Sequence, residues 1–195
     1  MGPSDAHEFL DLCATVRSNL SRDRYRHVLG VARTAERLAR RYGVSTHKAR
    51  VAAMIHDIAR MWNKQQLFDY ARRNGIAITA AEQDAPVLLH ARVGAHIATD
   101  RFGVTDPQML LAIERHTVAV PGMSDLEKIL YIADTIEPSR SFPQRAVLAA
   151  AADRSLDEGL LACIKSSMEY LTASGIPISK QTLALYNELV QRGEA

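Results

Sequence analysis

Apolar residues recur at intervals of three and four along most of the chain, the spacing that buries one face of a helix. The clearest example runs from Arg22 to Tyr42, and its predicted core positions are Tyr25, Val28, Leu29, Ala32, Ala35, Ala39 and Tyr42. Gly43 favours a helix end there, because glycine readily adopts the left-handed conformation that ends many helices. The best strand candidate, residues 76–79, is too short and isolated to form a sheet.

Capping signals divide the rest of the chain into similar segments. Three pairs match the capping box that opens a helix: Asn63 with Gln66, Thr79 with Glu82, and Ser124 with Glu127. Asp106–Pro107 places a capping residue before a proline at the first helical position. A third helix, capped by Ser45 or Thr46, is expected to carry His56–Asp57. We predict an all-α bundle of roughly eight to ten helices with short connections.

Composition fits this picture and narrows the class of protein. The chain has 195 residues, of which 47% are hydrophobic and 24% charged, as expected for one globular domain with a sizeable core. The net charge of +2 is too small to argue for a nucleic-acid partner. Basic residues nevertheless gather between Arg22 and Arg60, either as a solvated face or as one wall of a site for an anionic ligand.

Cellular setting is indicated by cysteine usage and by the lack of targeting signals. Cys13 and Cys163 both lie within helical patterns, so we expect reduced thiols and a cytoplasmic protein rather than a disulfide framework. No basic segment followed by a long apolar run opens the chain, so no signal peptide is expected. No stretch approaches the roughly 20 apolar residues that span a bilayer, and no membrane partner is expected.

Candidate chemistry centres on His56–Asp57, which closes the apolar run 51–55. The pair could simply mark a helix end, but a buried ionised aspartate is costly unless it is paired or bound to a metal. The candidate ligands, each on or at the end of a predicted helix, are His27, His56, Asp57, His90, His116 and Asp134. Helices that converge on one point build metal sites in bundles. Imidazole and carboxylate ligands suit iron, manganese, cobalt or zinc rather than calcium.

The sequence around these positions resembles the HD-domain metal-dependent phosphohydrolases, and in particular their YqeK subfamily. The segments that carry the resemblance are 25–32, 53–60, 89–95, 113–117 and 131–140. The most specific is the run Ala-Asp-Thr-Ile-Glu-Pro-Ser-Arg at 133–140. The chain departs from the family at Val118 and Ala119, where a second Thr and a Gly are usual. We expect a single HD domain over 1–195, with a motif core at 24–140 and C-terminal helices over 143–192 packed on it.

This resemblance implies a symmetrical bis(5'-nucleosyl)-tetraphosphatase, which splits diadenosine tetraphosphate into two ADP. It implies a divalent metal, iron in the family with manganese or cobalt as alternatives, held by His27, His56, Asp57 and Asp134. His90 and His116 match phosphate contacts, or ligands of a second metal in wider HD relatives. With His56 and Asp57 they form the implied catalytic set. The implied substrate contacts are Arg24, His27, Asp57, Arg60, His90, His116, Thr117, Asp134, Arg140 and Tyr170; for Tyr170, stacking near the nucleotide and a core role are both open.

Two other functions use the same residues. One keeps the HD chemistry but acts on mononucleotides as a phosphatase, or on cyclic nucleotides as a phosphodiesterase. The other is a non-catalytic nucleotide-binding module, against which the complete ligand set argues. A homodimer fits both the resemblance and the frequency of symmetric oligomers.

Overall fold

The computed structural model describes residues 3–193, and all regular structure in that range is helical. Of the predicted domain 1–195, residues 1–2 and 194–195 lie outside the described part. The α-helices are α1 (Pro3–Asn19), α2 (Arg22–Arg41), α3 (Thr46–Ile55), α4 (Lys64–Arg73), α5 (Ala80–Asp84), α6 (Leu89–Phe102), α7 (Pro107–Arg115), α8 (Asp125–Ile136), α9 (Arg145–Arg154), α10 (Leu156–Ala173) and α11 (Lys180–Gly193). A short 3-10 helix, Pro86–Leu88, precedes α6. The all-α prediction is confirmed. The described residues form eleven α-helices, one more than the upper end of the expected eight to ten, and the shortest is α5 with five residues.

Local capping chemistry fixes where several helices begin. The predicted capping boxes are present in full at α4, α5 and α8, which Asn63, Thr79 and Ser124 open. The side chain of Asp106 accepts hydrogen bonds from the first amides of α7. These contacts satisfy helix-end amides that lack partners within the helix. Asp106 and Ser124 fix where α7 and α8 begin, and the predicted site residues His116 and Asp134 lie at the opposite, C-terminal ends of these helices.

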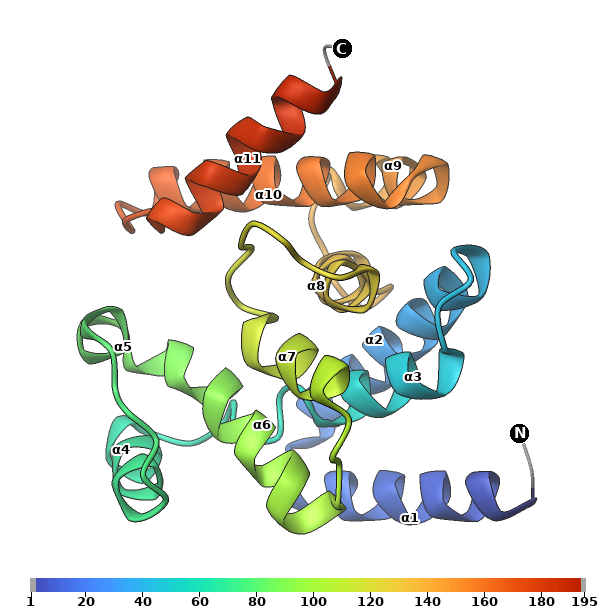
Figure 1. Cartoon of the computed structure of the whole chain (residues 1–195), viewed down its shortest axis with the longest axis vertical. Coiled ribbons are helices and arrows are strands. Elements are labelled where there is room, and N and C mark those ends of the chain that lie inside the picture. Colours follow the sequence, from blue (N-terminus) through green and yellow to red (C-terminus); the bar gives the residue numbers. More distant parts are fainter. Residues whose placement is uncertain (1–2, 194–195) are drawn as a thin grey trace.

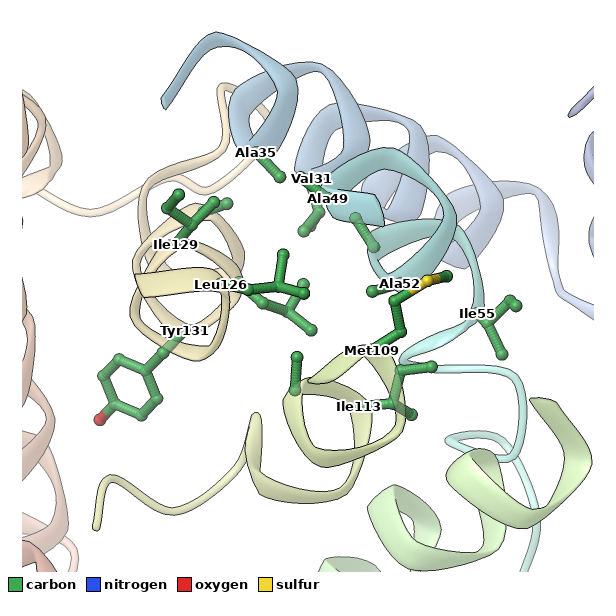
Figure 2. Packing of buried hydrophobic residues seen from close by; sticks show 14 of the residues in the cluster. Val31, Ala35, Ala49, Ala52, Ile55, Met109, Ile113, Leu126, Ile129 and Tyr131 are labelled. Carbon is green, nitrogen blue, oxygen red and sulfur yellow. The ribbon is translucent and has the colours of Figure 1, made fainter. Parts of the chain in front are cut away.

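The main core lies where α2, α3, α7 and α8 meet. Figure 2 shows Val31 of α2, Ala52 of α3, Met109 of α7 and Leu126 of α8 pointing toward one another. All four are buried, so removal of apolar surface from water holds these helices together. Tyr131 points away from this centre (Figure 2) and places its hydroxyl 3.4 Å from Ser167 Oγ of α10.

The second helix buries a wider face than the predicted one, and four predicted core positions are confirmed as buried: Val28, Ala32, Ala35 and Ala39. Tyr25, Leu29 and Tyr42 are only half-buried, whereas Val31 and Leu38, absent from the predicted core, are fully buried. The physical reason is that both α3 and α8 pack against α2. A helix covered by two neighbours buries a wider stripe than a single three-and-four pattern describes.

The C-terminal helices α9, α10 and α11 lie on the side of α8 away from α3 and α7 (Figure 1). Both α9 and α10 contact α8, and α11 contacts α10. Gly159 allows α10 to approach α9 closely, because a Cβ atom at this position would lie 2.6 Å from Ala152 Cα of α9. No helix in the described range is long and apolar enough to cross a membrane.

One predicted boundary is wrong, and the difference matters for the site. The third helix was expected to carry His56–Asp57, but α3 ends at Ile55 and His56 is its C-terminal cap. Short turns follow, in which Ile58 N donates to Ile55 O and Arg60 N donates to Asp57 O. The reading of His56–Asp57 as a helix end is therefore correct, and the tight turn points both side chains into the interior.

Candidate active site

The six predicted ligands come together, and Asp57 lies beside all four of the histidines. Its Oδ2 lies 3.7 Å from His27 Nε2 and 3.5 Å from His56 Nε2. Its Oδ1 lies 3.1 Å from His90 Nε2 and 3.6 Å from His116 Nε2. All five side chains are buried. Four helices thus bring histidines from distant parts of the chain to one carboxylate.

Asp134, in the last turn of α8, completes the set. Its Oδ1 lies 2.9 Å from His27 Nε2 and 3.8 Å from His56 Nε2. Despite these short distances, the buried Nε2 atoms of His27 and His56 have no hydrogen-bond partner among the described residues. A buried polar atom without a partner is costly. The two nitrogens therefore face a point between two carboxylates where a cation would satisfy them.

Hydrogen bonds to Nδ1 direct the four histidine rings. In His56, His90 and His116, Nδ1 contacts the backbone carbonyl three residues earlier, at 2.6 Å for His56 and 2.7 Å for His116. A carbonyl only accepts, so Nδ1 must carry the hydrogen in each ring. In His27, Nδ1 lies 2.9 Å from Glu137 Oε1. Each Nε2 is therefore left facing Asp57.

These distances fit coordination of a divalent metal. Ligand atoms about 2.1 Å from one ion are separated by about 3.0 to 3.4 Å in octahedral or tetrahedral geometry. Gaps of 2.9 to 3.8 Å separate the donor atoms of His27 and His56 from those of Asp57 and Asp134, close to that range. The first compact group is His27, His56 and Asp57, whose donor atoms lie within 4.8 Å of one another, and Asp134 approaches it through the two histidines. A second group, Asp57 with His90 and His116, shares the same aspartate, and its donor atoms lie within 4.8 Å of one another. The donor chemistry suits a borderline divalent cation.

The charge states of His56, Asp57 and Asp134 match those that metal ligation requires. Burial alone would lower the pKa of His27, but Asp134 and Glu137 beside the ring outweigh it and raise that pKa, so a cation must displace a proton from His27. Burial lowers the pKa of His56 to about 4, so its ring is neutral near pH 7. Burial alone would raise the pKa of Asp57 and of Asp134, but neighbouring histidines outweigh it. For Asp134, Arg140 adds to this effect. Neutral imidazole and ionised carboxylate are the forms that bind metals.

Arginines bound to the two carboxylates form the rim of the cluster. Arg24 Nη1 donates to Asp57 Oδ2 at 2.8 Å, and Arg140 Nη2 donates to Asp134 Oδ1 at 2.7 Å. Arg60 also lines the cavity described below. Their planar guanidinium groups are suited to bind phosphate with two parallel hydrogen bonds.

The basic run between Arg22 and Arg60 serves both of the roles that its sequence left open. Arg24 and Arg60 line the cavity, as a wall for an anion would. By contrast, Arg37 pairs with Asp153 and Arg40 with Glu36 on the outer surface.

A cavity of about 830 Å³ opens above the cluster and runs between α8 and α10. Such a volume is typical of a small-molecule site. Its lining includes the predicted residues Arg24, Asp57, Arg60, His90, His116, Thr117, Asp134, Arg140 and Tyr170. Tyr170 is 69% exposed, so the core role considered for it is wrong. His27 and His56 lie beneath, at the base of the cluster.

Sequence reasoning missed residues on the far wall and one residue under the cluster. The far wall includes Phe142 and Ser167, which lie outside every motif, and Tyr131, which opens the segment 131–140 but was not assigned a role. Glu137, beneath His27, stands inside the distinctive run 133–140, and that position was its only signal. At the departure from the family pattern, the side chain of Ala119 is buried and its backbone carbonyl accepts a hydrogen bond from Thr182 of α11.

Comparisons with known proteins agree with this geometry. A chain named symmetrical bis(5'-nucleosyl)-tetraphosphatase from Bacillus subtilis (strain 168) is 37% identical over 177 residues, covering 91% of this chain and 95% of the relative. A relative of the same name from Halalkalibacterium halodurans is 36% identical and covers 90% of this chain and 93% of its own length.

A solved structure from Clostridium acetobutylicum is described as a predicted HD superfamily hydrolase involved in NAD metabolism. It superposes with a TM-score of 0.88 at 35% identity, covering 94% of this chain and 97% of that one. Residues 24–139 match the HD domain, a span that contains all six predicted ligands. The chain therefore belongs to the HD domain family.

Proposed function

We propose that this chain hydrolyses diadenosine tetraphosphate symmetrically, producing two ADP. The observation that carries the proposal is the His/Asp cluster at the floor of a cavity rimmed by Arg24, Arg60 and Arg140. Such a site pairs a cation-binding floor with anion-binding walls, as a polyphosphate substrate requires. The two relatives named as symmetrical bis(5'-nucleosyl)-tetraphosphatases, similar over about nine-tenths of the chain, support the same substrate.

In the proposed site, His27, His56, Asp57 and Asp134 hold a divalent metal, which we propose to be iron. When bound, such an ion polarises a phosphoryl oxygen and lowers the pKa of water toward neutrality. Resident iron would be found by elemental analysis of protein purified without chelator. Manganese or cobalt in its place would change the proposed metal and leave the proposed ligands standing.

The other residues bind the polyphosphate and manage the proton. Arg24, Arg60, Arg140 and Thr117 bind phosphate oxygens and hold the polyphosphate of the substrate in line for attack. Water attacks one of the two central phosphorus atoms, and the bond from that phosphorus to the central bridging oxygen breaks. The leaving ADP keeps that oxygen, and the other ADP gains the oxygen of water. His90 or His116, whose Nε2 atoms lie 3.1 Å apart, holds the departing phosphate or gives it a proton.

A product assay tests the reaction. The purified full chain is incubated with diadenosine tetraphosphate and ferrous iron, manganese or cobalt in turn, and nucleotides are separated by ion exchange. ADP as the only product is expected. AMP together with ATP would mean attack at an outer phosphorus and would overturn symmetrical cleavage. No turnover with any of the three metals would refute diadenosine tetraphosphate as the substrate.

Matched variants test the site. His56→Ala and Asp134→Ala should lose turnover and metal content while the circular dichroism spectrum stays helical. His96→Ala is the control, because His96 is a half-buried histidine that contacts Tyr70, outside the cluster. It should keep both metal and activity. Equal losses in His96→Ala and His56→Ala would contradict the assignment.

The setting and assembly of the protein are also proposals. Cys13 and Cys163 are free thiols, which supports a reducing cytoplasm. A symmetric homodimer is proposed from the frequency of such assemblies, and light scattering on the purified chain tests it. The whole of 1–195 is proposed to act as one HD domain, which a single cooperative unfolding transition would support.

A further inference from the structure

Glu137 is a buried acid that contacts a predicted metal ligand without facing the cavity. It is 1% exposed and stands directly after α8, between Ile136 and Pro138. Its Oε1 lies 2.9 Å from His27 Nδ1, and its Oε2 accepts from Ser139 N at 2.8 Å. The hydroxyl of Ser139 donates to Oε1 as well. Both carboxylate oxygens are therefore engaged.

His27 needs a partner of this kind because of its place in the fold. His56 and His116 follow the last turns of α3 and α7, where carbonyl groups lack an amide partner and are free to accept from Nδ1. His90 stands at the junction of a 3-10 turn and α6. His27 lies within α2, where the carbonyls already accept amides of the next turn. Only a side chain from another element can direct its ring.

The opposite helix leaves room for that side chain. A Cβ atom at Gly30 would lie 2.3 Å from Glu137 Oε2 and 3.1 Å from its Cδ. Glycine at this position, one turn after His27 in α2, therefore allows the carboxylate to lie flat against the helix. The backbone also ties Glu137 to the rim, because Arg140 N donates to Glu137 O at 3.0 Å.

We propose that Glu137 is the positioning residue that keeps hydrogen on His27 Nδ1 and so presents a bare Nε2 to the metal. The inference rests on the proposed metal site and deepens it. An ionised carboxylate accepts and does not donate, so Nδ1 beside Glu137 carries hydrogen. Nε2 lies beside a second carboxylate, Asp134, and a cation bound between them takes the place of hydrogen on that atom. A carboxylate behind a ligating histidine also orients the ring and increases its basicity.

Glu137→Gln is the sharpest test, because it keeps the size of the side chain but replaces one of its two accepting oxygens with a donating NH₂ group. The amide of Ser139 can only donate, so the single carbonyl oxygen of glutamine is expected to replace Oε2. Its NH₂ group then faces His27 and donates to Nδ1. The ring must move its hydrogen to Nε2, the atom required for metal binding.

The experiment measures affinity for Co²⁺ or Mn²⁺ by competition with a chelator, using the full chain. Glu137→Gln should bind about 10- to 100-fold more weakly than wild type. Glu127→Gln is the matched control, because Glu127 is also buried at α8 and bonds Ser124 and Arg115. Its affinity should stay within threefold of wild type. Equal weakening in both variants would overturn the proposal.

A spectroscopic readout separates positioning from general structural damage. Nitrogen-15 NMR of the metal-free protein at pH 8 reports which ring nitrogen of His27 carries hydrogen. Wild type should carry hydrogen on Nδ1, and Glu137→Gln should lose it from that atom. An unchanged His27 form in a folded Glu137→Gln variant would overturn the inference. If that variant does not fold, Gly30→Ala tests the same contact by displacing the Glu137 carboxylate, and unchanged affinity and tautomer there would overturn it too.

Failure of this inference is distinguishable from failure of the proposed function. The binding and NMR measurements need no turnover, so they stand whether or not diadenosine tetraphosphate is cleaved. Wild-type protein that binds neither cation would refute the metal site itself. Wild-type binding with no effect of Glu137→Gln would refute only the role of Glu137.

Discussion

Replacing Gly30 by alanine asks whether the space beneath Glu137 is needed for metal binding. The added methyl group would lie 2.3 Å from Glu137 Oε2, well inside any non-bonded contact. That oxygen accepts from Ser139 N, and its partner Oε1 accepts from His27. The carboxylate must therefore rotate or withdraw, and its grip on the His27 ring is lost.

Two opposing effects set the stability of the Gly30→Ala variant. Alanine within a helix is favoured over glycine by about 1 kcal/mol. Overpacking costs about 1 to 3 kcal/mol, and the low end applies because the obstacle is the end of a side chain rather than backbone. The free energy of unfolding should thus change by no more than about 1 kcal/mol. Metal affinity should fall about 10- to 100-fold, equivalent to about 1.4 to 2.8 kcal/mol.

A double-mutant cycle isolates the cause. Glu137→Ala removes the carboxylate and leaves a space into which the methyl group at position 30 fits. If Gly30→Ala acts through Glu137, it should weaken Co²⁺ binding in the wild-type background and have little further effect in the Glu137→Ala background. Urea unfolding of all four proteins supplies the stability control. The same loss of affinity in both backgrounds, or none in either, would refute the reasoning.

Three further predictions concern stability. Gly159→Ala meets Ala152 Cα at 2.6 Å; backbone cannot yield as a side chain can, so we expect a net loss of about 1 to 3 kcal/mol in urea unfolding with metal affinity unchanged. Asp106→Ala removes the α7 cap and should cost about 1 kcal/mol at pH 7. The Lys48 ammonium lowers the pKa of Asp106 in the folded protein. The stability that Asp106 contributes is therefore present above its unfolded pKa of 3.8 and is lost as the pH falls through the lower folded pKa. The urea midpoints of wild type and variant should accordingly converge in acid. A cation at 100 times its Kd should stabilise the chain by about 2.7 kcal/mol, and an unfolding temperature insensitive to chelator would contradict binding to the native state.

Helix positions were predictable from the sequence because their signals are local. A capping box such as Ser124 with Glu127 spans four residues and acts within one turn. The packing around α2 was less predictable, since it is covered both by α3, which follows it directly, and by α8, which comes much later in the chain. A pattern along one helix does not reveal how many neighbours will cover it.

The site, like the fold, was predictable where the signal is local and was missed where it depends on contacts between distant parts of the chain. Histidine and aspartate are few and chemically distinctive, so their gathering could be proposed from residue type and motif. The contact between His27 and Glu137 joins positions 110 residues apart. A glutamate at the end of a helix usually has a solvent-facing role, and no periodicity marks it as buried. Its burial becomes visible only when α2 and the end of α8 are placed side by side.

Substitutions elsewhere in the chain affect the orientation of the four histidine rings to different degrees. A main-chain carbonyl is present whatever residue supplies it, so the rings of His56, His90 and His116 tolerate new side chains at the positions that hold them. His27 alone depends on a pair of side-chain identities, glycine at 30 and glutamate at 137. Evolution can change either member only together with the other, and a designer who transplants this cluster to another bundle must carry both.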